Sequence, residues 1–143
     1  MNPSEIFIKR PIATSLLMAA IAMFGIVAYH AAGKARDLGV PAELLMQHGE
    51  VSEPVARAMA EGCRQRFDAD YALSITGIAG PTGGTPEKPV GAVWIALADR
   101  NAPTVANLHR FSGDRSSIRD RSAQTALNTL RLRLISLAAD ARR

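Results

Sequence analysis

The chain has 143 residues, the size of one ordinary domain, and its 48% hydrophobic content excludes a largely disordered polypeptide. The net charge is +4 and the pI is about 9.8, but the arginines are scattered and only 5% of the residues are aromatic. Nucleic-acid surfaces combine clustered cations with stacking side chains, so we expect no nucleic acid partner.

The N-terminal segment is apolar. No charged residue occurs from Pro11 to Tyr29, which is just long enough for a helix that spans a bilayer. Lys9 and Arg10 precede it and favour a cytoplasmic N-terminus. A transmembrane helix is the favoured interpretation, with inner-membrane anchoring through residues 11–29. A helix buried in a core and a secretory signal peptide are the alternatives.

The residues that follow predict a compact α/β domain that opens with two helices. Residues 41–48 suit a short helix ended by Gly49. Ser52 is a typical N-cap for a second helix that runs to about Phe67, with Pro54 in its first turn. An apolar face recurs every four residues along this second helix and consists of Val55, Met59, Cys63 and Phe67.

Three strands and a long helix follow. Residues 71–76 read as a strand, and residues 90–98 are apolar on both faces, which is typical of a central strand covered on both sides. Residues 104–111 are the candidate third strand, and Asp114 is a candidate cap for a helix that begins near Arg115. The expected buried stripe of this helix consists of Ile118, Leu127, Leu130, Leu134 and Leu137, and the side chains expected to face solvent or a ligand are Arg119, Arg121, Arg131 and Arg133.

A loop rich in glycine and proline joins the first two strands. It lacks the Gly-Lys-Ser/Thr ending of a P-loop, and it is not a GxGxxG motif because a strand follows it. Two readings stay open, a long β-hairpin connection and a loop whose backbone N–H groups approach an anion. The glycines that would permit close approach are Gly77, Gly80, Gly83 and Gly84, and the prolines that stiffen the path are Pro81, Pro86 and Pro89.

Cysteine and histidine content argues against a metal. Cys63 is the only cysteine, which leaves no disulfide framework and no CxxC site, and we expect it to be a small core residue. The histidines, at positions 30, 48 and 109, lack the spacing of a zinc motif.

The loop and its flanks carry a family resemblance. TGIAGPTGGTPEKPVG, residues 76–91, resembles the signature of the CinA C-terminal domain, the nicotinamide-nucleotide amidohydrolase family. Residues 32–74 are similar to the segment before that signature, and FSGDRSSIRDRSAQTALNTL, residues 111–130, is similar to the closing segment. The resemblance covers about residues 29–138.

The resemblance implies a cytoplasmic hydrolase that needs neither metal nor cofactor. Such enzymes convert nicotinamide mononucleotide and water to nicotinic acid mononucleotide and ammonia, using a serine nucleophile with lysine as its base. A buried lysine with a lowered pKa can accept the serine proton. Carried over by motif, Lys34 is the base and Tyr29 its neighbour, although Ala31 replaces the Asn of the family's Tyr-x-Asn-x-x-Lys pattern. The implied substrate-binding residues are Thr76, Gly77, Gly80, Gly83, Gly84 and Arg115.

The family's nucleophile motif, Glu-Ser-Cys-Thr-Gly-Gly, does not occur in this sequence, and Ser15 is a poor substitute because it lies in the apolar run. Residues 1–31 instead resemble the first membrane helix of RND multidrug efflux pumps. The two resemblances meet between Ala28 and Gly33, where we expect a join of two unrelated genes.

We therefore expect two regions, an apolar helix over residues 1–30 and an incomplete CinA-like domain over residues 31–143. Loss of the family's first strand and helix predicts an unpaired sheet edge and exposed apolar surface. The favoured function is an impaired amidohydrolase with nicotinamide mononucleotide as its small-molecule partner. The alternative is a non-catalytic, membrane-associated fusion fragment, and a homo-oligomer is compatible with both.

Overall fold

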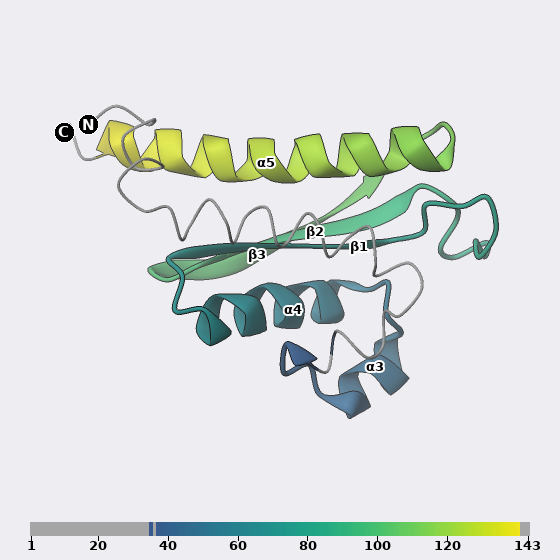
Figure 1. The fold of residues 1–143 in the computed structure, drawn as a ribbon, viewed down its shortest axis with the longest axis horizontal. Helices are drawn as coiled ribbons and strands as arrows, with labels where there is room; N and C mark the ends of the chain where they lie inside the picture. The colour runs from purple at the N-terminus through teal and green to yellow at the C-terminus, as the bar shows by residue number, and fades with distance from the viewer. Residues whose placement is uncertain (1–34, 36, 141–143) are drawn as a thin grey trace.

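The computed structural model describes residue 35 and residues 37–140. In this part of the chain a three-stranded sheet lies between two helical layers (Figure 1). Helix α5, Arg115–Asp140, covers one face of the sheet, and helices α3, Ala42–His48, and α4, Glu53–Arg66, lie on the other side. The expected mixture of helices and strands in one compact unit is confirmed.

The sheet is antiparallel, in the order β1–β2–β3. Its strands are β1, Tyr71–Gly77; β2, Ala92–Asp99; and β3, Ala102–Arg110. Strand β2 is central and all its residues except Trp94 are buried, which confirms the prediction of a strand covered on both faces. Each flanking strand pairs only with β2 among the described residues.

Two different kinds of core lie on the two faces of the sheet. On the α5 side, branched side chains such as Ile75, Ile95 and Ile118 pack together. On the α4 side the contact is made mainly of alanines, among them Ala60 and Ala96. Alanine has a short side chain, so α4 lies close to the sheet and little apolar volume is needed between them.

The short segment before α3 also lies close to α4. A Cβ atom on Gly62 would fall 1.8 Å from the backbone oxygen of Leu38, so only glycine fits at this position of α4. Ala35, Leu38 and Val40 are buried in a third cluster with Val55 and Met59. The helix α4 therefore joins the residues before α3 to the sheet.

Three side-chain predictions for the helices are wrong. Phe67 is 46% exposed because α4 ends there and the chain turns away through Asp68, whose φ is +47°. Leu127 is 37% exposed, since the inward stripe of α5 runs through the smaller Ser122 and Ala126 between Ile118 and Leu130. Ser52 occupies the N-cap position of α4, but its hydroxyl donates to the oxygen of Gly49 instead of accepting a helix N–H.

The apolar N-terminal segment, residues 11–29, lies outside the described residues, so neither its helical form nor its place in a membrane is tested. In the part of the chain that the structure describes, no helix combines the length and the apolar character that a membrane crossing requires. Among the described residues, Val105 and Leu108 of the edge strand β3 are 52% and 43% exposed. The expected loss of a strand and a helix concerns the N-terminal part of the domain, so it stays a prediction.

Candidate functional site

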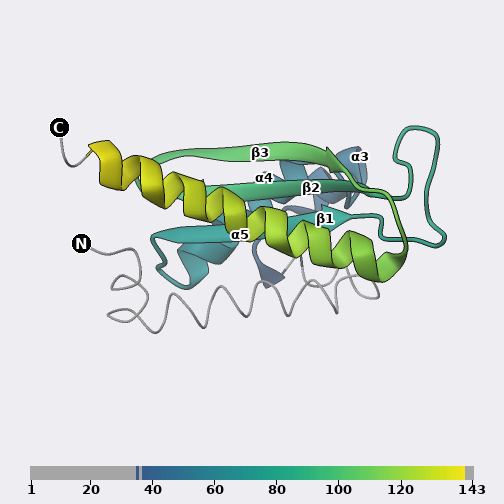
Figure 2. The same ribbon diagram turned by 90° about the horizontal axis from the view of Figure 1, so that it is seen from above.

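The glycine-rich connection between β1 and β2 extends past the sheet at the end where α5 begins (Figures 1 and 2). Two backbone hydrogen bonds close its base, from Ile78 N to Ala92 O at 3.0 Å and from Gly91 N to Ile78 O at 2.7 Å. Near its far end, Thr85 N donates to Lys88 O at 2.9 Å, and Lys88 N donates to Thr85 Oγ1 at 3.1 Å. The loop is therefore held by its own hydrogen bonds at both ends.

Three of the four predicted glycines are explained by close packing against the returning chain. A Cβ atom on Gly77 would lie 2.6 Å from Val93 Cγ2, and one on Gly80 would lie 2.6 Å from Val90 Cγ1. A Cβ atom on Gly84 would lie 2.8 Å from Val90 N. A Cβ atom on Gly83 would make only an ordinary contact, 3.9 Å from Ile78 Cγ2, but the φ of +91° at Gly83 favours glycine. Packing of the connection thus accounts for most of its glycine content, and ligand contact is not required to explain it.

Two side chains attach the loop region to the link between α3 and α4. Thr76 Oγ1 donates to Glu50 O at 2.8 Å, and Lys88 Nζ donates to His48 O at 2.9 Å. His48 is the last residue of α3, so the ammonium lies where the negative end of the helix dipole favours a cation. The contact made by Lys88 was not predicted from the sequence, because His48 is 40 positions away.

The start of α5 contacts the loop from the other side. One guanidinium nitrogen of Arg115, Nη1, donates to Gly80 O at 3.0 Å. Asp114 caps the helix as predicted, accepting from Ser117 N at 2.8 Å. Hydrogen bonds from the side chain and the main chain of Ser117 lower the pKa of Asp114 below its ordinary value. The structure therefore brings Arg115 and the glycine loop together, as the proposed site requires.

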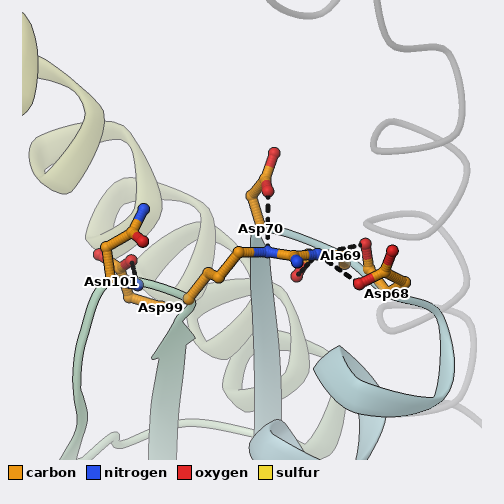
Figure 3. A network of polar contacts seen from close by, with 6 residues as sticks. Asp68, Ala69, Asp70, Asp99 and Asn101 are labelled. Carbon is orange, nitrogen blue, oxygen red and sulfur yellow. Dashed lines mark hydrogen bonds and ion pairs between the residues drawn. The ribbon is translucent and has the colours of Figure 1, made fainter.

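The opposite end of the sheet carries a network of charged side chains (Figure 3). Arg100 donates to Asp68 Oδ1 at 2.6 Å and forms an ion pair with Asp70 Oδ1 at 3.1 Å. The side chain of Asp99 is 4% exposed, and its Oδ2 accepts from Arg133 Nε at 2.8 Å while its Oδ1 accepts from Asn101 N. These contacts join the β2–β3 turn to α5 and to the start of β1, which is a stabilising role.

The remaining predictions concern the catalytic base, a metal site and the cysteine. Lys34 and Tyr29 lie outside the described residues, so the proposed base and its neighbour are not placed.

Over the described residues, no group of three or more His, Cys, Asp or Glu side chains is arranged to hold a metal ion. Cys63 is half-buried against the cores on both sides of α4, and burial raises the pKa of its thiol. A protonated thiol is a poor nucleophile.

Comparison with known proteins identifies one family. A family model described as the CinA C-terminal domain matches residues 18–134. This match begins within the segment that resembles an efflux-pump helix, and the comparisons give that second resemblance no support. The expected division of the chain into residues 1–30 and residues 31–143 stays a prediction.

Curated relatives agree with the family match. A CinA-like protein of Gemmatimonas aurantiaca is 54% identical over 116 residues, and one of an Anaeromyxobacter species is 59% identical over 116 residues. These alignments cover 81% and 80% of this chain but only 27% and 28% of the relatives. The chain therefore spans little more than a quarter of their length.

Solved structures show the same fold. The competence/damage inducible protein CihA from Agrobacterium tumefaciens is 43% identical, with a TM-score of 0.65, over 67% of this chain and 59% of that one. A CinA superfamily protein from Enterobacter cloacae is 32% identical, with a TM-score of 0.66, over 72% of this chain and 60% of that one.

Proposed function

Because the chain belongs to the CinA C-terminal domain family, we propose that its ancestral activity is hydrolysis of a nicotinamide nucleotide and that this activity is impaired. The substrate would be nicotinamide mononucleotide, whose amide C–N bond is cleaved by water to give a carboxylate and ammonia. The observation that carries the proposal is the hydrogen bond from Arg115 to Gly80 O, which links the two most characteristic motifs of the family resemblance at one site.

The binding side of this site is formed by the loop and the start of α5. The residues are Thr76, Gly77, Gly80, Gly83, Gly84 and Arg115, which come from β1, the connection and the first turn of α5. Arg115 supplies a cation, and Gly83 is the least crowded of the four glycines. A phosphate group suits such surroundings, since guanidinium and backbone N–H groups are its usual donors.

The catalytic side is incomplete in this sequence. Lys34 is the proposed base and Tyr29 its neighbour, but the Glu-Ser-Cys-Thr-Gly-Gly motif that would supply the nucleophile is absent. A base without a nucleophile to activate contributes little to amide hydrolysis. We therefore expect the chain to bind the nucleotide without hydrolysing it. The proposed reaction uses no metal and no other cofactor.

The experiment is to measure ammonia release from nicotinamide mononucleotide by the purified chain and by Lys34→Ala. We expect no release above the uncatalysed background from either protein, with circular dichroism showing that both are folded. Release by the parent chain that disappears in Lys34→Ala would contradict the proposed impairment, because another residue would then have to replace the missing serine.

A non-catalytic, membrane-associated fragment is the second candidate. The uncharged run over residues 11–29 favours it, as does the absent nucleophile motif. In this case the domain over residues 31–143 would be attached to the inner membrane by residues 1–30, whereas an amidohydrolase would act in the cytoplasm. Membrane fractionation separates the two, since recovery of the whole chain in the soluble fraction without detergent contradicts membrane attachment. A homo-oligomer is compatible with either candidate.

A further inference from the structure

The first turns of α5 present two arginines with different surroundings. Arg115 already donates through Nη1 to the backbone oxygen of Gly80. Arg119 is exposed, and over residues 37–140 the structure shows neither a hydrogen bond nor an ion pair to its side chain. One arginine is thus engaged in holding the loop, and the next one along the helix is free to bind a ligand.

Helical geometry places Arg119 on the inward side of α5. Arg119 precedes Ala126 by seven residues, so the two lie on the same helical face to within about 20°. Ala126 is buried against the sheet, and Ile118, next to Arg119, is only 1% exposed. Arg119 is nevertheless exposed, although Ile118 before it and Ser122 after it are both buried.

The pictures show what lies at this end of α5. In both views the beginning of α5 lies beside the base of the glycine-rich connection (Figures 1 and 2). Arg115 and Arg119 are four residues apart, which places their side chains on neighbouring positions of one face. The contact between Arg115 and Gly80 fixes that face next to the loop.

From this juxtaposition we propose that Arg119 is the residue that binds the phosphate of a nucleoside monophosphate, and that Arg115 is a positioning residue that holds the loop. This inference rests on the proposed function and deepens it by dividing the work between the two arginines. A guanidinium with all its donors unused binds a phosphate through two parallel N–H···O bonds. Arg115 has spent one of its donors on Gly80 O.

The test uses calorimetric titration of the full chain, Arg119→Gln and Arg121→Gln with nicotinamide mononucleotide and with the matching riboside, which lacks the phosphate. Arg121 is the matched control, since it is an exposed arginine on another face of the same helix. Its Nη1 donates to Ser112 O at 3.4 Å. We expect Arg119→Gln to weaken mononucleotide binding roughly tenfold to a hundredfold, with riboside binding unchanged. Arg121→Gln should bind both as the parent does.

Arg115→Gln separates holding the loop from binding the phosphate. A positioning role predicts that Arg115→Gln weakens binding of the mononucleotide and the riboside to a similar extent, because the whole loop shifts. Normal mononucleotide binding by Arg119→Gln would overturn the assignment of the phosphate to Arg119. A loss in Arg115→Gln that is specific to the mononucleotide would overturn the positioning role of Arg115.

A further measurement separates failure of the proposed function from failure of the phosphate site at Arg119. If the parent chain binds neither the mononucleotide nor the riboside, the nicotinamide-nucleotide proposal fails, and inorganic phosphate is titrated while thermal unfolding is followed. If inorganic phosphate raises the melting temperature of the parent and of Arg121→Gln but not that of Arg119→Gln, the result supports phosphate binding by Arg119. An unchanged melting temperature of the parent in phosphate would overturn the proposed phosphate site at Arg119.

Discussion

The two ends of the sheet are stabilised in different ways. At the end with the glycine-rich connection, backbone atoms approach one another closely, as at Gly91, where a Cβ atom would lie 1.8 Å from Phe111 O. At the other end, ion pairs connect segments that are distant in sequence. Arg100 pairs with Asp68 (Figure 3), and Asp99 pairs with Arg133 of α5.

This difference predicts two kinds of sensitivity. Close backbone packing tolerates no added atom but is indifferent to salt, since no net charges are involved. Exposed ion pairs tolerate substitution and are screened by salt, whereas a pair with one buried member is screened less. The family motif thus lies at the end where the sequence has least freedom to change.

The largest effect is expected for Gly91→Ala. The added methyl group meets the backbone of Phe111, which cannot rotate away, and the φ of +90° is unfavourable for alanine. We expect a loss on the order of 4 kcal/mol or more in the free energy of unfolding, measured by urea denaturation. Gly39→Ala is the matched control, since Gly39 has a φ of +80° with nothing within 4 Å. Equal losses in the two variants would show that backbone conformation, and not close packing, limits this end.

An intermediate effect is expected for Arg133→Met at the charged end. The carboxylate of Asp99 stays buried and loses its cationic donor, so we expect a loss of roughly 1.5–3 kcal/mol. Arg131→Met removes an exposed arginine two positions away and should change stability by no more than about 0.5 kcal/mol. Chemical denaturation of both variants measures these changes. Equal unfolding midpoints for Arg133→Met and the parent would show that the pair of Asp99 and Arg133 does not stabilise this end of the sheet.

The smallest effect concerns pH at the start of α5. Because the folded-state pKa of Asp114 lies below its ordinary value of 3.8, the carboxylate contributes stability above that value and loses it as the pH falls through the folded-state pKa. Asp114→Asn keeps a capping side chain but cannot titrate. Below about pH 4, the melting temperature of the parent should therefore fall more steeply than that of Asp114→Asn. Parallel curves for the two proteins would rule out this contribution.

Local sequence patterns predicted the elements well, and the reason is physical. The continuous apolar run of β2 and the Asp114 cap depend on neighbours along the chain, so the sequence displays them directly. Patterns of spacing failed for Phe67 and Leu127, because an apolar side chain at the right interval is exposed where the helix ends or where smaller residues form the contact.

The contacts that shape the candidate site could not be predicted in this way. Thr76 meets Glu50 across 26 positions, Lys88 meets His48 across 40, and Arg115 meets Gly80 across 35. Each depends on how the helices pack against the sheet, which no short pattern encodes. The loop motif indicated where the candidate site lies, and only the fold shows which side chains contact the loop.

The single thiol of Cys63 has a practical consequence. Cys63 belongs to α4 and is half-buried against two hydrophobic clusters, and this burial raises the pKa of its thiol. A thiol-alkylating reagent at neutral pH should therefore react slowly while α4 is in place. Transient separation of α4 from the sheet would expose the thiol and permit labelling. With one cysteine in the sequence, the modification rate followed by mass spectrometry reports this local opening directly, without an engineered probe.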